Sequence, residues 1–145
     1  MAIPGEDDWR GIHVGPLEAQ DIVDSFCGKS FQEAVAMCEA DAMSYAGNLL
    51  FMPAAPFNFY APALASYVAS ERAHDDCDGA SSFLSMVEYM LSYRREIVAR
   101  ETMELLMNAA AVVAGRQEYY DADREIYGSF RGRHERLLAL VDNAV

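Results

Sequence analysis

The sequence predicts an all-α fold, a single domain built as a bundle of about six helices with a proline-rich buried bend in its middle. Apolar residues recur at spacings of three and four along most of the chain, which is the pattern of helices with one buried face. No segment alternates apolar and polar residues as a half-buried strand does. The length of 145 residues and the apolar share of 52% suit one closed core and exclude a disordered chain.

Residues 1–15 are predicted to form an irregular N-terminal arm, and residues 16–145 a single helical domain. The arm holds Trp9, the only tryptophan, whose large ring we expect to fix the arm to the core. Pro16 suits the first turn of a helix, where its missing N–H has no partner to lose. We expect this helix to continue for about ten residues, until Gly28 supplies a left-handed stop.

A capping box marks the start of the second helix. The Ser30 hydroxyl can accept from the backbone N–H of Glu33, and the Glu33 carboxylate can accept from that of Ser30. An apolar stripe follows, widened by Met43, and Gly47 ends the helix. The stripe consists of Phe31, Val35, Cys38, Ala42 and Tyr45.

The stretch 49–63 combines dense aromatic residues with prolines at positions 53, 56 and 62. Because proline breaks the backbone hydrogen bonding of a helix, we expect a buried bend here rather than one continuous helix. The bend is expected to include a helical turn that starts near Pro53 or Pro56. A second helix should then run through Pro62 to about Arg72. The aromatic side chains of this stretch are interpreted as core, and the alternative is that the segment from Leu49 to Tyr67 lines a ligand pocket.

The remaining chain is also predicted to be helical. Residues 74–79 form a polar loop, after which Ser81 or Ser82 can cap a helix. Helical spacing then runs over 83–113, as one helix or as two, and a short helix is expected over about 119–126. A closing helix has Leu137, Leu138 and Val141 on its inner face and Arg131, Arg133 and Arg136 outside.

The charge is strongly acidic and unevenly distributed. The chain has 23 acidic and 11 basic side chains, a net charge of −12. Residues 1–91 hold 14 acids and 3 bases, whereas residues 92–145 hold 9 acids and 8 bases. This balance opposes binding to a nucleic-acid backbone or to an anionic membrane surface. Two interpretations of the acidic excess remain: it serves solubility alone, or it forms a surface that binds a basic protein partner.

Catalytic and metal-binding motifs are absent from the sequence. Three cysteines without a C-x-x-C pair predict neither a disulfide framework nor a zinc site. The pair Glu101 and Glu104 lacks the histidine of a di-iron bundle, and the loop 74–78 lacks the spacing of a calcium loop. We therefore expect no metal, no cofactor and no enzymatic activity. The N-terminus lacks the features of a signal peptide, so the expected location is the cytoplasm.

Acidic clusters and paired tyrosines are the candidate partner-binding residues. Consecutive carboxylates attract a basic surface over long distances, and tyrosine amid acids is typical of protein interfaces. The predicted contacts are Glu6, Asp7, Asp8, Asp75, Asp76, Asp78, Tyr119 and Tyr120.

Two segments carry a resemblance to a family. Phe57-Asn58-Phe59-Tyr60-Ala61-Pro62-Ala63 resembles the aromatic-Tyr-x-Pro-Ala segment of an uncharacterised family of small bacterial proteins, and Cys27-Gly28-Lys29-Ser30-Phe31 resembles the Gly-Lys-x-aromatic segment that precedes it there. That family implies no activity. In size and acidity the chain is also similar to bacterial immunity proteins, which neutralise a cognate toxin.

The leading hypothesis is a cytoplasmic immunity or inhibitor protein that occludes the active site of a basic toxin, such as a nuclease. One alternative is a phage- or plasmid-borne inhibitor that mimics nucleic acid with the same carboxylates. The other is a small ligand-binding or enzymatic helical domain that uses the aromatic pocket from Leu49 to Tyr67.

Overall fold

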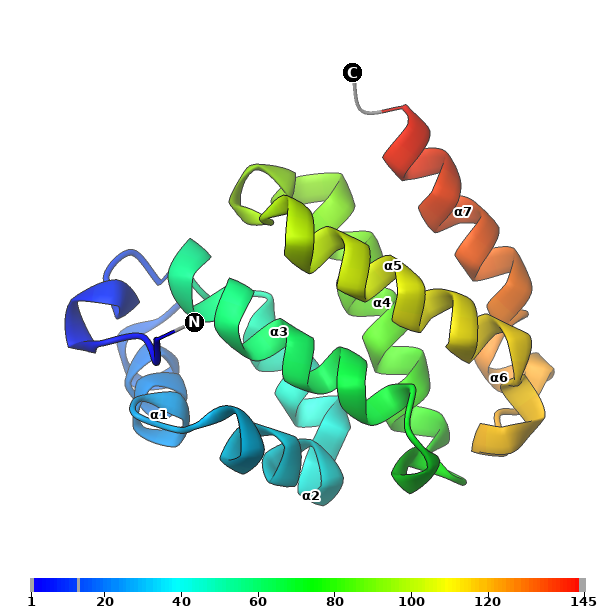
Figure 1. The fold of residues 1–145 in the computed structure, drawn as a ribbon, viewed down its shortest axis with the longest axis horizontal. Coiled ribbons are helices and arrows are strands. Elements are labelled where there is room, and N and C mark those ends of the chain that lie inside the picture. Colours follow the sequence, from blue (N-terminus) through cyan, green and yellow to red (C-terminus); the bar gives the residue numbers. More distant parts are fainter. Residues whose placement is uncertain (1, 13, 144–145) are drawn as a thin grey trace.

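A computed structural model describes residues 2–12 and 14–143 (Figure 1). Within these residues the chain is helical and has no strand, which confirms the predicted all-α fold. The α-helices are α1 (Pro16–Phe26), α2 (Phe31–Leu49), α3 (Ala54–Val68), α4 (Cys77–Tyr93), α5 (Arg100–Gly115), α6 (Arg124–Tyr127) and α7 (Phe130–Asp142). Short 3-10 helices connect them: η1 (Glu6–Trp9), η2 (Glu71–Ala73), η3 (Arg95–Ile97) and η4 (Gln117–Tyr120).

The N-terminal arm is held to the bundle by Trp9, as expected. Its side chain is 4% exposed, and its ring centroid lies 6.3 Å from that of Phe26 and 5.9 Å from that of Tyr60. Pro16 occupies the first turn of α1, and Gly28 has a φ of +80° directly after the helix. This positive φ is the left-handed conformation that glycine adopts without strain.

The capping box of α2 forms as predicted. The Ser30 hydroxyl accepts from the Glu33 N–H at 3.1 Å, and the Glu33 carboxylate accepts from the Ser30 N–H at 2.9 Å. The helix bends at Asp41, which has φ −161° and ψ 81°, a bend that the apolar pattern did not predict. The expected stripe is wrong at its edges, because Phe31 and Met43 are exposed by 36% and 53%.

The prolines interrupt the chain less than expected. The bend is confined to residues 50–53, and α3 then runs without a break from Ala54 to Val68. Pro53 caps the helix and Pro56 lies in its first turn, so neither removes a helical hydrogen bond. Pro62 lies inside the helix, where it removes one backbone hydrogen bond, and its neighbours Ala61 and Ala63 are fully buried.

The region 83–113 forms two helices, and the structure corrects the predicted start of the first. Asp76, not Ser81 or Ser82, caps α4 by accepting from the Gly79 N–H at 2.9 Å. The turn between α4 and α5 is stabilised by contacts from other elements. The Arg94 guanidinium donates to the Leu50 carbonyl at 2.7 Å, and the Asn58 amide oxygen accepts from the Ala99 N–H at 2.9 Å.

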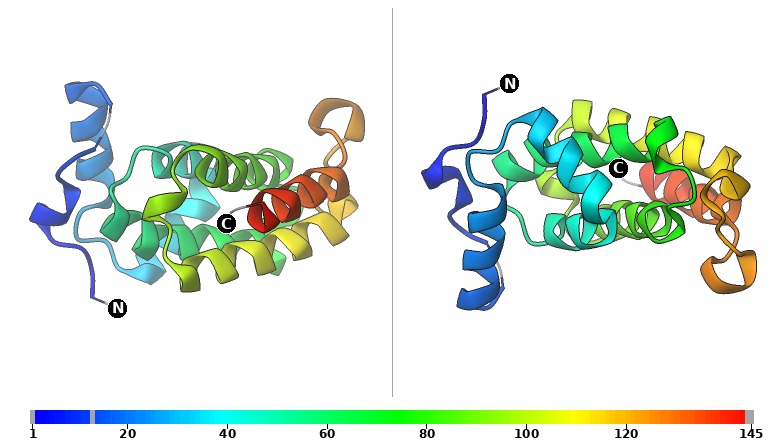
Figure 2. Two further views of the ribbon diagram at one scale, coloured as in Figure 1. Left: turned by 90° about the horizontal axis from the view of Figure 1, so that it is seen from above. Right: turned by 90° about the horizontal axis from the view of Figure 1, so that it is seen from below.

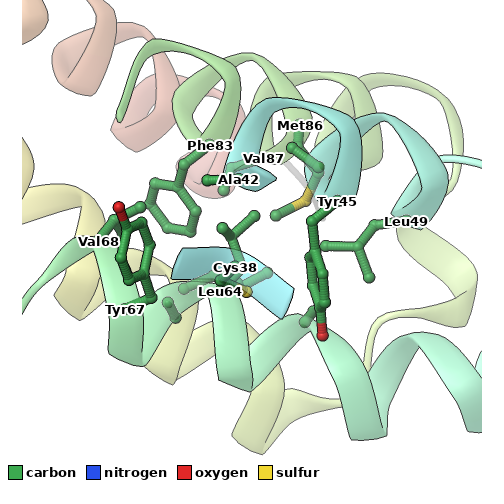
Figure 3. Close-up of a cluster of buried hydrophobic side chains, with 14 of the residues drawn as sticks. Cys38, Ala42, Tyr45, Leu49, Leu64, Tyr67, Val68, Phe83, Met86 and Val87 are labelled. Atoms are coloured by element: carbon green, nitrogen blue, oxygen red, sulfur yellow. The ribbon is translucent and has the colours of Figure 1, made fainter. Parts of the chain in front are cut away.

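The core lies where α2, α3 and α4 meet, with α5 and α7 covering the other side of the bundle (Figures 1 and 3). Phe83, Met86 and Val87 of α4 pack against α2 and α3, whose contributions include Cys38, Ala42, Tyr45, Leu64 and Val68. The N-terminal arm and α1 lie at one end of the bundle and α6 at the other (Figure 2). No helix among the described residues is long and apolar enough to cross a membrane.

Candidate functional site

A polar hollow of about 460 Å³ lies between the bend of α2, the segment around η2 and the first turn of α4. Most of its polar side chains are acidic, and we refer to it as the acidic hollow. Its carboxylates are Glu39, Asp41, Asp75, Asp76 and Asp78. Arg72 and His74 also line it. The hollow therefore presents five carboxylates to one arginine.

Asp76 and Asp78 are positioned by the N-terminus of α4. The second carboxylate oxygen of Asp76 accepts from the Tyr67 hydroxyl at 2.7 Å. Burial raises the pKa of Tyr67, and the hydrogen bond to the Asp76 carboxylate raises it further, so the phenol remains a donor. Asp78 accepts from the Tyr127 hydroxyl at 2.7 Å. Both carboxylates lie where the helix dipole favours negative charge.

Asp75 projects from the turn that precedes α4. Its φ is +63°, in the left-handed region that aspartate tolerates better than most residues. Its N–H donates to the Tyr119 carbonyl at 3.0 Å, and its carboxylate lies 3.3 Å from Nδ1 of His74. The carboxylate is 64% exposed and faces solvent. Asp75 is therefore fixed through its backbone, with its charge available to a partner.

The opposite side of the hollow is formed by α2. Glu39 forms an ion pair with Arg72, and Asp41 accepts hydrogen bonds from the backbone and hydroxyl of Ser44 at 3.1 and 2.8 Å. These bonds hold the pKa of the Asp41 carboxyl below its ordinary value, so it stays charged. Hydrogen bonds within the fold thus hold the carboxylates of Asp41, Asp76 and Asp78, and the ion pair with Arg72 holds that of Glu39.

The structure brings together only part of the predicted contact set. Asp75, Asp76 and Asp78 share the acidic hollow, whereas Glu6, Asp7 and Asp8 lie in η1 at the end of the bundle next to α1 (Figures 1 and 2). In η1, Asp7 pairs with Arg10 at 3.1 Å and Asp8 accepts from the Gly5 N–H at 2.8 Å. The two clusters therefore do not form one surface.

Glu39 and Asp41 were missed by sequence reasoning. They are distant in the chain from the cluster at 75–78, and the packing of α2 on α4 brings them beside it. Single acids on a helix carry no local signal of a shared site.

The paired tyrosines Tyr119 and Tyr120 differ in burial. Tyr120 is fully buried, accepts from Nε of Arg116 at 2.9 Å and donates to the Val68 carbonyl at 2.6 Å. A contact between Tyr120 and a partner is therefore the wrong expectation, because its ring and hydroxyl are used inside the fold. Tyr119 is half-buried, donates to the Glu71 carbonyl at 2.7 Å and stacks under the Arg116 guanidinium at 4.2 Å.

The large aromatic side chains of the stretch 49–63 are core, as the sequence predicted. Phe57 and Tyr60 are fully buried, and Phe59 is 8% exposed. An apolar cavity of about 380 Å³ lies over the outer face of α3, at the C-terminal part of this stretch, and against α5. Its lining includes Phe31, Pro62, Ala65, Leu105 and Val112.

The two segments that carry the family resemblance meet in space. The Tyr60 hydroxyl donates to the carbonyls of Phe26 and Lys29 at 2.7 and 2.9 Å, which joins α3 to the turn between α1 and α2. These hydrogen bonds give Tyr60 a structural role.

The carboxylates of the acidic hollow attract cations. Among residues 2–12 and 14–143, no three or more histidine, cysteine or acidic side chains are placed to hold a metal ion. Lysine and arginine side chains are the groups that such fixed carboxylates bind in charge-assisted hydrogen bonds. Comparison of the chain with protein-family models, with curated proteins and with solved structures finds no match.

Proposed function

We propose that this protein is a non-catalytic immunity or inhibitor protein. It docks its acidic hollow on the basic active-site cleft of a cognate toxin, such as a nuclease, and so excludes the substrate. The observation that carries the proposal is the set of five carboxylates around one arginine, four of them held by hydrogen bonds or an ion pair. A cleft that binds a polyanionic substrate is lined with cations, and a preorganised acidic surface is its complement.

The distribution of arginines supports the same proposal. Arg94, Arg95 and Arg116 donate to the carbonyls of Leu50, Leu140 and Val68, so these cations are directed into the fold. They do little to neutralise the carboxylates of the hollow. The first 91 residues, which supply every acid of the hollow, hold almost the whole net charge of the chain.

The test is the rate of association with a toxin encoded beside this protein, together with inhibition of that toxin. The triple variant Glu39→Gln, Asp75→Asn and Asp78→Asn removes three charges from the hollow and leaves the capping residues Asp41 and Asp76 in place. We expect the association rate at low salt to fall about tenfold or more, with a weaker dependence on salt.

The matched control is Glu101→Gln, Glu125→Gln and Glu135→Gln, which removes three exposed charges from the C-terminal third. It should change the association rate by no more than about twofold, because these charges lie outside the hollow. Equal effects of the two triple variants would show that only total charge matters, and would overturn the proposed site.

A further inference from the structure

The acidic hollow continues into an apolar groove between α2 and α4. The second depression has a volume of about 290 Å³, and Met43 lines both the hollow and this depression. We refer to it as the α2–α4 groove. It is lined by Met43, Ala46, Gly47, Leu50, Ser82, Ser85, Met86 and Tyr89.

The two helices run in the same direction past the groove. Along α2 the order is Asp41, Met43 and Leu50, and along α4 it is Asp78, Met86 and Tyr89, so both helices lead from acidic to apolar side chains. Met86 follows Asp78 by eight positions, which places the apolar centre about 12 Å along the helix from the carboxylates. The charged and apolar parts thus form one continuous strip.

The groove has the composition of a contact surface. Met43 is 53% exposed and Tyr89 is 37% exposed, although both line an apolar depression. Tyrosine and methionine are enriched at protein interfaces, and the flexible methionine chain adapts to different partners. Gly47 leaves the α2 side of the groove open, since a Cβ atom placed there would meet no atom within 4 Å.

The neighbouring charge distinguishes this groove from the other apolar cavity. The cavity at α3 and α5 is lined by no charged side chain, so nothing there specifies what would cover it. The α2–α4 groove adjoins five carboxylates, so its complement is a partner that carries cations beside an apolar group.

We propose that the α2–α4 groove binds a segment of a basic protein partner in which lysine or arginine side chains lie about 12 Å from a bulky apolar side chain. The cations contact the acidic hollow, and the apolar side chain enters the groove beside Met43, Met86 and Tyr89. This inference rests on the proposed function and adds an apolar contact to the electrostatic one. The electrostatic contact gives the rate of encounter, and the apolar anchor gives the lifetime of the complex.

The test uses two short synthetic peptides of equal charge. The anchored peptide carries lysines at one end and a leucine–phenylalanine pair at the other, and in the second peptide serines replace that pair. We expect the full chain to bind the anchored peptide at least about tenfold more tightly, because burial of one large apolar side chain contributes that much. Fluorescence anisotropy measures both affinities.

Gly47→Leu fills the groove, and Gly115→Leu is its matched control. Both glycines lie near the end of a helix, and a Cβ atom at either position meets no atom within 4 Å. We expect Gly47→Leu to abolish the preference for the anchored peptide and Gly115→Leu to keep it. Methyl NMR of the unmodified chain adds a readout that needs no variant: the Met43 and Met86 signals should shift with the anchored peptide, and those of Met103 and Met107 should not.

The outcomes separate the two proposals. Equal, salt-dependent binding of both peptides overturns the groove inference and leaves the acidic hollow as a binding site. Retained preference in Gly47→Leu, or methyl shifts confined to Met103 and Met107, also overturns the groove inference. Absence of binding by both peptides contradicts the groove and the electrostatic role of the hollow together.

Discussion

The indole of Trp9 is buried, but its N–H has no hydrogen-bond partner among the described residues. An unsatisfied buried donor costs free energy, so the contribution of Trp9 to stability comes from ring packing alone. Trp9→Ala should lower the free energy of unfolding by about 3 kcal/mol, whereas Trp9→Phe should lower it by about 1 kcal/mol or less. Urea unfolding followed by circular dichroism measures both. An equal loss in the two variants would mean that the indole N–H is stabilised in the folded protein.

Single carboxylates in this protein combine a structural and an electrostatic role. Asp76 caps α4 and accepts from Tyr67, and Asp41 restarts α2 through Ser44. Their negative charge remains at the surface because each accepts hydrogen bonds without a cation. The sequence identified the acidic cluster at 75–78 as a polar loop and a candidate contact, but not the capping role of Asp76, because that role depends on where α4 begins.

At the scale of the element, two glycines on the facing helices α2 and α4 differ in the space around them: a Cβ atom fits at Gly47 and does not fit at Gly79. Gly47 has open space at its Cβ position, so Gly47→Ala should raise the free energy of unfolding by about 0.5 kcal/mol through lower backbone entropy of the unfolded chain. A Cβ atom at Gly79 would clash with the carboxylate of Asp76, which caps α4, and would lie 2.9 Å from the Cβ of Ala42 in α2. Gly79→Ala should therefore lower the free energy of unfolding by about 1–3 kcal/mol.

Thermal and urea unfolding of these two glycine variants test the close approach of α2 and α4. The comparison controls for the intrinsic preference of alanine over glycine in a helix, which is common to both changes. If both variants were stabilised, the crossing at Gly79 would be looser than the structure describes.

Elements that depend on local signals were predictable, and elements that depend on distant contacts were not. The Ser30–Glu33 capping box and the stop at Gly28 follow from the chemistry of adjacent residues. The break before α5 depends instead on Arg94 reaching the Leu50 carbonyl, and the continuity of α3 through Pro62 depends on burial by other helices. The acidic hollow belongs to the second kind, because its α2 side comes from a distant part of the sequence.

At the scale of the whole molecule, arginines of the C-terminal third bind the ends of other elements. The Arg116 guanidinium donates to the carbonyls of Val68 and Ser70 beyond the end of α3, and that of Arg95 donates to Leu140 and Val141 in α7. The last carbonyls of a helix lack intrahelical hydrogen-bond partners and carry partial negative charge. An arginine side chain donates the missing hydrogen bonds and brings a positive charge to them. The guanidinium groups of Arg95 and Arg116 therefore bind inside the fold, where they do little to compensate the acidic surface of residues 1–91.

Cys38 and Tyr60 are weakly acidic groups whose protonation links the stability of the fold to alkaline pH. Burial raises the pKa of the Cys38 thiol to about 12 and that of the Tyr60 phenol to about 12, above their ordinary values of 9.0 and 10.0. The native chain therefore keeps these protons at a pH where the unfolded chain has lost them. Because the unfolded state binds fewer protons in this range, the free energy of unfolding decreases as the pH rises.

We expect stability to be nearly constant from pH 7 to 9 and to fall from pH 9 to 12, by about 1.4 kcal/mol per pH unit for each group that ionises only on unfolding. Urea unfolding at a series of pH values measures this slope. Cys38→Ala should reduce the slope above pH 9 whatever its effect at neutral pH, because it removes one of the ionising groups. Tyr93→Phe is the control, since Tyr93 is 73% exposed and should leave the slope unchanged. A slope unaffected by Cys38→Ala would contradict the burial of a protonated thiol at the contact of α2 with α3.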